Sequence, residues 1–329
     1  MEEEWWFFNV IVIKDFKMAS SFQSFVRPVF FLLLFVDIHL QESHSAASSP
    51  DGTNKNVPHQ KFSEKDKSKH FGYDKQSGPA VWAKMFHLCG GHSQSPVKLD
   101  TTITVTYHHP RIMWWNYSLK PQAMTISNNG HTVLLRAKWA RKEDTPYHWS
   151  APSSEEYVFE QLHFHWGQDD HSGSEHMLNN ERFALEMHVV HYRRDLGSVE
   201  NAGLYDSGIR VIGVFFRISE AEHHNVGLQQ IVQLLQTIRM ANSTVVLLEP
   251  FPLSRLVPEF SNLYLTYNGS LTTPPCAETV SWVIRKEPLT ISRQQVEEFR
   301  NLMSEDGQTI KHNWRPVQPL NGRTVIQIR

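Results

Sequence analysis

The apolar positions in the second half of the chain follow the period of β-strands. Alternating or continuous apolar residues occupy Phe183–Tyr192, Ile209–Ile218 and Glu278–Arg285. Successive side chains of a strand point to opposite faces of a sheet, and a strand that is buried on both faces is apolar throughout. All three segments are therefore predicted strands.

Two segments follow the helical period instead. The first is Gly227–Ala241, and the second begins at Ser292, which forms a capping box with Gln295. The apolar positions of these helices are Leu228, Ile231, Leu235 and Ile238 in the first and Val296, Phe299 and Met303 in the second. Helices and strands together indicate a mainly β domain of the α+β class, with peripheral helices.

One polar stretch divides the chain. Residues 48–69 contain almost no apolar side chains, so they cannot bury enough surface to offset the entropy lost on ordering. They are predicted to form a flexible polar linker behind an N-terminal extension, residues 1–47. From His70 onward no second polar break interrupts the pattern, which indicates a single domain over residues 70–329.

The N-terminal extension contains two apolar runs, Trp5–Ile13 and Val29–Val36. Both are far shorter than the roughly 20 residues that a membrane-spanning helix needs, so no stable membrane span is expected. The second run follows Arg27 and precedes small residues, which is the order of a secretory signal peptide and predicts a secreted, extracellular protein. An uncleaved signal-anchor is the alternative, and the start of translation is open between Met1 and Met18.

The charge balance excludes one class of partner. The formal net charge is -2, and no long basic stripe occurs in the sequence. Proteins that bind nucleic acid need a positive surface to neutralise phosphates. No nucleic-acid partner is therefore expected.

Cys89 and Cys276 are the only cysteines in the sequence. An even count in a secreted chain favours a disulfide, because the extracellular environment is oxidising. The alternative is two free, buried thiols.

Histidines stand at alternate positions in Glu160–Gly167, whose sequence is EQLHFHWG. In a strand, His163 and His165 would point to the same face, as would Gln161. The chain contains 19 histidines, so a lone pair of this kind arises readily by chance and can simply fill space in a core. A metal site requires a third ligand.

The stretch EMHVVH supplies that ligand, because Glu186, His188 and Val190 would share one face of a strand. Three neutral imidazoles suit Zn2+ and leave a fourth position open, as in catalytic zinc sites. Gln161 and Glu186 each stand two residues before a histidine. They are predicted to accept hydrogen bonds from the ring nitrogens that do not bind the metal.

Eight motifs stand in order along the predicted domain: GYDKQSGPAVW, SQSPV, NNGH, QLHFHWG, GSEH, EMHVVH, GSLTTPPC and NWRPVQPL. With them the chain resembles the α-class carbonic anhydrases. The resemblance implies a zinc enzyme that interconverts carbon dioxide and bicarbonate, in a family that is itself the reference case for zinc lowering the pKa of bound water to about 7. It also implies a central, twisted, mostly antiparallel sheet of about ten strands.

The resemblance assigns roles to several polar residues. Thr272 matches the threonine that accepts a hydrogen bond from zinc-bound hydroxide, and Glu175 matches the carboxylate that accepts the threonine's own hydrogen bond. An ionised carboxylate can only accept, so Thr272 would keep its lone pairs for the hydroxide. His131 matches the proton shuttle, for which an imidazole pKa of about 6.5 is suited. Tyr73 and Asn129 match residues that order the connecting waters.

Carbon dioxide is uncharged, so its pocket is expected to be apolar. Val190 faces the metal by strand parity. The other pocket positions follow from the resemblance and are Val211, Leu271, Val280 and Trp282. Each of the five would otherwise be read as ordinary core.

The resemblance also covers the cysteines. Secreted family members have a disulfide that matches Cys89 with Cys276 and would brace the loop carrying Thr272. With both cysteines paired inside one chain, a monomer is expected.

The chain departs from the family at a few positions. Leu134 stands where many active members have a polar residue beside the proton path, and Phe71 stands where tryptophan is common. The first change could slow proton export without abolishing zinc binding. The segment Ala137–Glu156 also departs, and it predicts an altered surface loop near the mouth of the cavity.

Three sequons could carry glycans in the secretory pathway, at Asn116, Asn242 and Asn268. The first two are the expected sites. Asn268 is close in sequence to Thr272, where a bulky glycan would be hard to fit.

Two other functions are open from the sequence. A catalytically silent binding or matrix protein would keep the fold, but related silent domains lose a zinc histidine, whereas His163, His165 and His188 are all present. A general zinc hydrolase would need a peptide or phosphate subsite, and none is recognisable.

Overall fold

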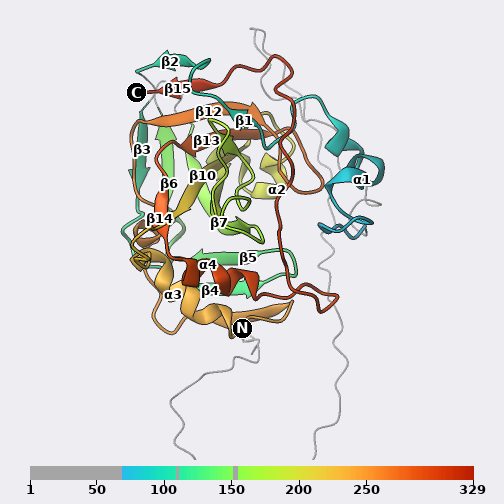
Figure 1. Ribbon diagram of the computed structural model, residues 1–329. Coiled ribbons are helices and arrows are strands. Elements are labelled where there is room, and N and C mark those ends of the chain that lie inside the picture. Colours follow the sequence, from blue (N-terminus) through green and yellow to red (C-terminus); the bar gives the residue numbers. More distant parts are fainter. Residues whose placement is uncertain (1–68, 109–110, 151–154) are drawn as a thin grey trace, which may run out of the picture. The chain divides into compact units, whose positions relative to one another are not determined.

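The computed structural model describes residues 69–108, 111–150 and 155–329 (Figure 1). All of these belong to one unit, Asn56–Arg329. The predicted signal peptide, and the predicted linker except Lys69, lie outside the described residues. Within the described ranges, no helix has both the length and the apolar character to cross a membrane.

Strands make up most of the regular structure. They are β1 Lys98–Leu99, β2 Val105–Tyr107, β3 Ile112–Trp115, β4 Ala123–Asn128, β5 Val133–Lys138, β6 Tyr147–Ser150, β7 Tyr157–Trp166, β8 Met177–Leu178, β9 Leu185–Arg193, β10 Ile209–Ile218, β11 Ser243–Val246, β12 Tyr264–Gly269, β13 Val280–Arg285, β14 Leu289–Ile291 and β15 Ile326–Ile328. The α-helices are α1 Pro79–Met85, α2 Val199–Ala202, α3 Val226–Leu235 and α4 Arg293–Arg300. Short 3-10 helices are η2 His87–Gly90, η3 Lys142–Asp144, η4 Arg194–Leu196 and η5 Leu253–Arg255.

A 13-stranded sheet forms the body of the fold (Figure 1). Its main path runs β11-β4-β5-β7-β9-β10-β13-β12-β15-β2, and β14, β3 and β6 pair beside it. Most neighbours are antiparallel, whereas β10 pairs in parallel with β13 and β14, and β15 with β2. The prediction of a mainly β domain with a large, mostly antiparallel sheet and a few helices is confirmed.

Most predicted elements keep their place with shifted ends. Strand β10 has the predicted bounds, and the capping box of Ser292 and Gln295 begins α4. The first predicted helix is too long, because α3 ends at Leu235 and the next turn tightens, with Ile238 N–H bonding to the carbonyls of Leu234 and Leu235. Ile238 is still fully buried, so its apolar spacing reflects the core rather than a continuing helix.

Part of the expected surface loop Ala137–Glu156 is a strand. Strand β6 pairs with β3 and with β7. Its buried positions hold His148 and Ser150, and the half-buried ones hold aromatic side chains. Because polar residues occupy the buried face, the hydrophobic pattern did not predict a strand here.

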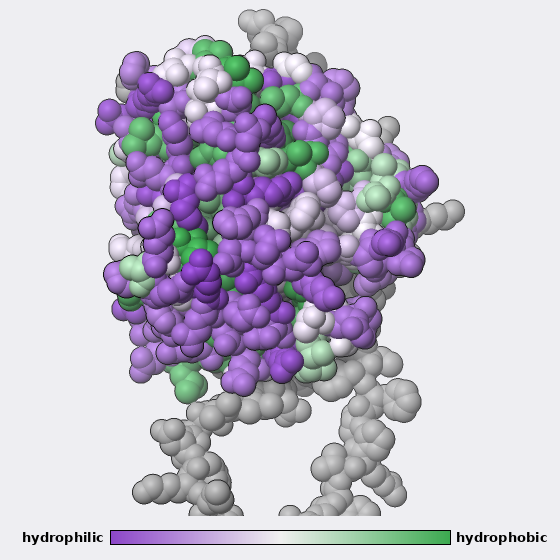
Figure 2. Space-filling view, in the orientation of Figure 1, coloured by the Kyte–Doolittle hydropathy of each residue, from purple (hydrophilic) through white to green (hydrophobic). Residues whose placement is uncertain are grey.

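Each face of the sheet carries its own apolar layer. The first layer contains Leu162, Phe164, Met187 and Val189, and helices α3 and α4 cover it. A second layer lies on the other face, where Val190 and other side chains of β9, β10 and β13 meet. The outer face drawn in Figure 2 is mostly hydrophilic, with apolar residues in small, separate patches.

A β-bulge in β7 changes the face of the sheet to which its side chains point. Phe159 lies opposite His191 of β9, whereas Gln161 lies opposite Val190, so the register shifts between them. Phe159 consequently packs in the first apolar layer, and Gln161 faces the second. Without the extra residue, the period of two would put both side chains on one face.

The imidazole of His148 is buried in the core. Its side chain is fully covered, and neither ring nitrogen has a partner among the described residues. The ring lies 4.5 Å from that of His191, whose Nε2 is hydrogen-bonded to the Tyr117 hydroxyl at 2.5 Å. Burial, and then the nearby His191 and Arg210, hold the pKa of His148 well below its usual value.

We expect His148 to make the fold sensitive to acid. Its pKa is lower in the folded than in the unfolded chain, so the unfolded chain binds the extra proton below pH about 6.5, and stability falls as the pH falls. His148→Phe should reduce the pH dependence of the unfolding free energy between pH 6.5 and 4 by up to about 1.4 kcal/mol per pH unit. Denaturant unfolding at several pH values measures this slope.

His171→Phe, at an exposed position, is the matched control and should leave the slope unchanged. The phenylalanine ring is larger than the imidazole, and any packing cost that it adds would lower the unfolding free energy by the same amount at every pH, so the slope would not be affected. An unaltered slope in His148→Phe would show that His148 is protonated at little cost in the folded protein.

Candidate metal centre

Pairing of β7 with β9 brings three histidines together on the second face of the sheet. His163 lies directly opposite His188 in the register, and His165 lies two residues further along β7. One ring nitrogen of each lies within 4.8 Å of the others. The structure therefore gathers the three predicted ligands in one cluster, which is consistent with a metal site.

Each imidazole is held by a hydrogen bond at one ring nitrogen. Gln161 Oε1 lies 2.9 Å from His163 Nδ1, and Glu186 Oε1 lies 2.8 Å from His188 Nε2. The backbone carbonyl of Asn313 lies 2.7 Å from His165 Nδ1. All three partners are acceptors, so each bonded nitrogen carries the hydrogen and the other nitrogen keeps a lone pair.

The lone pairs belong to Nε2 of His163, Nε2 of His165 and Nδ1 of His188. The buried Nε2 of His165 has no hydrogen-bond partner among the described residues. A buried nitrogen without a partner is costly, and a metal ion would satisfy it. This donor set fits zinc, which prefers neutral imidazole nitrogens in tetrahedral sites.

Burial also keeps the three imidazoles in the form that binds metals. It lowers the pKa of His165 to about 4, holds that of His163 well below its usual value and lowers that of His188. The rings are thus neutral at pH 7. Neutral imidazole is the form that coordinates metal ions.

Glu186 anchors a second group of polar side chains. Its Oε1 accepts from His188 and, at 2.8 Å, from His176 Nδ1, and its Oε2 accepts the backbone N–H groups of Glu175 and His176. His176 Nε2 in turn meets the Tyr267 hydroxyl at 2.7 Å. His176, Glu186 and His188 therefore also form a cluster of possible ligands, but hydrogen bonds occupy both nitrogens of His176. Although burial raises the pKa of Glu186, the two histidines lower it well below its usual value.

Glu175 lies beside the three histidines. Its Oε2 is 3.5 Å from His165 Nε2 and 3.9 Å from His188 Nδ1, and its Oε1 accepts the N–H of Arg315 at 2.7 Å. Burial raises the pKa of Glu175 to about 7, and His188, the Thr272 hydroxyl and the Arg315 N–H partly offset this. A cation at the free ring nitrogens would favour the ionised carboxylate further.

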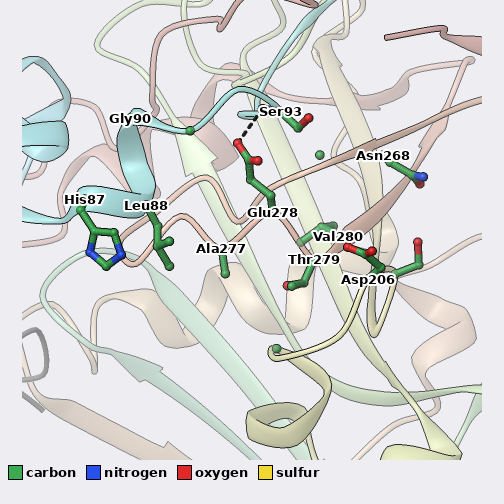
Figure 3. A pocket seen from close by; sticks show the side chains of 14 residues that line it. His87, Leu88, Gly90, Ser93, Asp206, Asn268, Ala277, Glu278, Thr279 and Val280 are labelled. Atoms are coloured by element: carbon green, nitrogen blue, oxygen red, sulfur yellow. Dashed lines mark hydrogen bonds between the residues drawn. The ribbon is translucent and has the colours of Figure 1, made fainter. Parts of the chain in front are cut away.

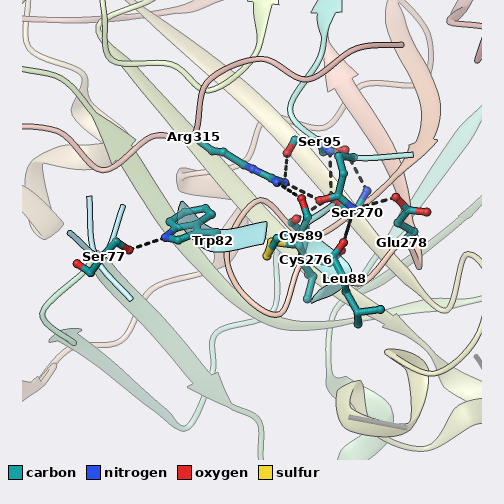
Figure 4. Close-up of a disulfide and its surroundings, with 11 residues drawn as sticks. Ser77, Trp82, Leu88, Cys89, Ser95, Ser270, Cys276, Glu278 and Arg315 are labelled. Atoms are coloured by element: carbon teal, nitrogen blue, oxygen red, sulfur yellow. Dashed lines mark hydrogen bonds between the residues drawn. A yellow bond between two sulfur atoms is a disulfide. The ribbon is translucent and has the colours of Figure 1, made fainter. Parts of the chain in front are cut away.

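A disulfide and a buried arginine lie close together beside Ser270 and Cys276 (Figure 4). Cys89 and Cys276 are bonded, with their Cα atoms 4.8 Å apart, so the predicted disulfide is confirmed. The Arg315 guanidinium donates to the Cys89 carbonyl at 2.9 Å. The N–H of Leu271 bonds to the Ala277 carbonyl at 3.0 Å and closes the loop that carries Thr272.

The five predicted pocket residues meet in the second apolar layer. Val211 lies opposite Val190 on one side and Trp282 on the other. The Trp282 ring lies 4.8 Å from that of His188, which puts apolar surface directly beside the histidines. Val280 belongs to the same layer, and Leu271 is half-buried against it.

His131 stands in a turn next to the histidine strand. Gly130 has φ +86°, a conformation that suits glycine, and Asn129 Oδ1 accepts the N–H of His131 at 3.0 Å. The His131 ring is stacked on Phe71 with centroids 4.3 Å apart. Burial, and then His70, lower its pKa. Tyr73 lies beside Phe71, and burial and Glu175 raise the pKa of its hydroxyl.

The structure also gives positions for Leu134, which departs from the family pattern, and for the asparagines of the three sequons. Leu134 of β5 lies directly opposite His163, so this apolar residue adjoins the cluster. Asn116 is half-buried, and its side-chain amide donates to the Glu143 carbonyl at 2.9 Å. Asn242 and Asn268 are exposed.

The sequence patterns did not single out three residues of this network: Asn313, Arg315 and His176. Asn313 and Arg315 stand in the motif NWRPVQPL, and His176 closes the motif GSEH. These residues stand within the family motifs, but neither strand parity nor sequence spacing shows which side chains of a motif reach the histidine cluster.

Two comparisons with known sequences point to the same family. The sequence profile of eukaryotic-type carbonic anhydrases matches residues 77–329. Carbonic anhydrase 3 of Bos taurus is 35% identical over 263 residues, which cover 78% of this chain and 98% of the relative. Carbonic anhydrase 3 of Sus scrofa is 34% identical with the same coverage.

We expect Gln161 to strengthen metal binding through His163. Gln161→Ala should weaken zinc affinity by about 10–100-fold, because the ring would lose the acceptor that fixes its tautomer and orientation. Competition with a coloured zinc chelator measures the affinity. Gln122→Ala, at an exposed position, should bind zinc like the wild type. Equal affinities for all three proteins would exclude a role for Gln161 at the metal.

Proposed function

Because the chain belongs to the eukaryotic-type carbonic anhydrase family, we propose that it is a zinc-dependent enzyme that hydrates carbon dioxide reversibly to bicarbonate and a proton. The observation that carries the proposal is the set of three neutral imidazoles whose ring nitrogens converge within 4.8 Å. Nε2 of His163, Nε2 of His165 and Nδ1 of His188 would hold the ion. When bound, zinc supplies an acidified water as the nucleophile.

Thr272 and Glu175 would orient that nucleophile. Thr272 would donate its hydroxyl hydrogen to the carboxylate and so could only accept from the nucleophile, which would leave the reactive lone pair directed at the substrate. The bond from the Arg315 N–H to Glu175 Oε1 at 2.7 Å supports this role, because it fixes the carboxylate in place. Such orientation contributes through positioning rather than through added charge.

Carbon dioxide would lie against the apolar side chains beside His188. Val190, Val211 and Trp282 form a continuous row across three strands. An uncharged substrate gains little from polar contacts, and a dry wall excludes competing water.

His131 would carry the released proton to solvent. Its ring is half-buried and its turn is fastened next to β7, because Asn313 Nδ2 donates to the His131 carbonyl at 2.9 Å. A neutral ring nitrogen can take a proton that arrives through water and release it at the surface. Tyr73 and Asn129 would order that water, and Leu134 would leave one side of its path apolar.

We also propose that the protein is secreted and monomeric. The Cys89–Cys276 bond supports secretion, since disulfides persist in oxidising compartments. A signal peptide within residues 1–47, a linker over residues 48–69 and a catalytic domain over residues 70–329 complete this account. Asn116 and Asn242 are the proposed glycan sites.

Thr272→Val should lower kcat/KM for carbon dioxide hydration by on the order of 100-fold, the loss typical for one orienting hydrogen bond at a reacting centre. Stopped-flow hydration with a pH indicator measures it, and the zinc content should be unchanged. Thr266→Val, on β12 outside the cluster, is the control. Wild-type activity in Thr272→Val would remove Thr272 from the mechanism, and zinc-loaded wild type without activity would refute the proposed function.

His131→Ala should lower kcat by on the order of 100-fold in dilute buffer while kcat/KM is retained, because proton export follows bicarbonate formation. Added imidazole should restore the rate, since a diffusible base replaces the missing side chain. The comparison uses His171→Ala, whose histidine is exposed elsewhere. If kcat is unchanged, or falls without rescue by imidazole, His131 does not shuttle the proton.

A further inference from the structure

An exposed histidine and an exposed carboxylate lie beside His131, the residue proposed to carry the proton. The ring of His70 lies 5.8 Å from the His131 ring, with an angle of 38° between the two planes. Glu305 Oε2 lies 4.0 Å from His70 Nδ1. His131 is half-buried, whereas His70 and Glu305 are exposed, so the three side chains lead from the interior to the surface.

Aromatic packing holds His70 next to His131. Phe71, the following residue, stacks on the His131 ring with centroids 4.3 Å apart and meets the Trp82 ring edge-on at 5.6 Å. Trp82 is fully buried, and its Nε1 donates to the Ser77 carbonyl at 2.7 Å. Phe71 therefore connects His131 to a fixed part of the core, and this keeps the backbone of His70 beside the ring.

Two other contacts hold Glu305 in place. Its Oε1 accepts from the Asn242 amide at 3.1 Å. Its Cγ lies 2.9 Å from the position that a Cβ atom at Gly130 would occupy, so the side chain packs over the turn that carries His131. A carboxylate held in this way loses less entropy on meeting a cation than one that rotates freely.

The cavity of about 520 Å³ in Figure 3 is not part of this arrangement. Asp206 and Glu278 line it, and none of His70, His131 and Glu305 does. The titratable neighbours of His131 that reach solvent are thus on the surface, not in that cavity.

The charges around His131 differ in sign. Burial lowers the pKa of His131, His70 lowers it further, and Glu305 raises it. Asp74 is a second carboxylate that interacts with His70. Protons on the two rings repel each other, and the carboxylates stabilise whichever ring is charged. The pair of rings therefore favours passing one proton outward over holding two.

We propose that His70 is the next proton acceptor after His131 and that Glu305 is a positioning residue for this step. The step belongs to the proposed hydration cycle and rests on that proposed function. The imidazolium of His131 gives its N–H proton to water, and the water gives a proton to the neutral ring nitrogen of His70. Only N–H and O–H bonds form and break, and Glu305 stays ionised. His70 then releases the proton to bulk water or buffer.

The first test is independent of activity. NMR of isotope-labelled histidine rings in the full-length protein follows the titration of His70 and His131, and His70→Ala and His131→Ala assign the two signals. Glu305→Gln should lower both pKa values by about 0.2–0.7 pH unit, which corresponds to one exposed ion pair. Glu249→Gln, at an exposed carboxylate elsewhere, should lower neither. Unchanged pKa values in Glu305→Gln would remove Glu305 from the step.

The second test measures the proton step in the zinc-loaded protein. His70→Ala should lower kcat in dilute buffer by about 3–10-fold, less than His131→Ala does, because His131 can still release its proton to water. The kcat/KM should be retained, and added imidazole should restore kcat. In a protein that already carries His131→Ala, the same change should cost nothing further, since the two residues serve one path.

His171→Ala, at an exposed position, is the matched control and should leave kcat unchanged. An active wild type whose kcat is unaffected by His70→Ala would refute the relay alone. So would an equal loss from His70→Ala with and without His131. A zinc-loaded wild type that does not hydrate carbon dioxide would refute the proposed function itself, and the relay with it.

Discussion

The antiparallel pairing of β7 with β9 determines where the three histidines of the candidate metal site meet. Its register puts His163 opposite His188 and His165 opposite Glu186. A slip of one residue in β9 would turn His188 into the apolar layer beneath α3 and α4 and expose Met187 and Val189 on the other face. The packing of ordinary hydrophobic residues therefore selects the register that assembles the histidines, and the bulge after Phe159 lets one strand serve both layers.

Burial imposes the second constraint. The three imidazoles are neutral, so they contribute no charge to offset that of a bound dication. Two carboxylates stand close enough to do so, Glu175 at 3.5 Å from His165 Nε2 and Glu186 through its hydrogen bond to His188. Buried charges are tolerated when they are paired and hydrogen-bonded, and both carboxylates accept backbone N–H groups as well. With a dication bound and both carboxylates ionised, the charges of the site would balance.

Strand parity predicts much of this site from the sequence, because Gln161, His163 and His165 alternate along one strand and Glu186 and His188 along another. Both hydrogen bonds expected from that spacing are present. Asn313 lies 148 residues from His165, so only the folded chain brings its carbonyl to the ring. Strand β6 was not predicted, because the polar residues His148 and Ser150 occupy its buried positions and break the hydrophobic pattern. Local periodicity predicts which residues share a face, whereas long-range partners and polar side chains in the core depend on tertiary packing.

The most direct test of the account combines zinc content and carbon dioxide hydration on the same full-length samples. The wild type and His188→Ala would be compared before and after removal and readdition of zinc. We predict that wild-type activity disappears with the metal and returns in proportion to the zinc bound, while His188→Ala neither retains zinc nor recovers activity. Wild-type hydration that is independent of zinc content, or full zinc and full activity in His188→Ala, would contradict the claim that the paired strands β7 and β9 build a catalytic metal centre.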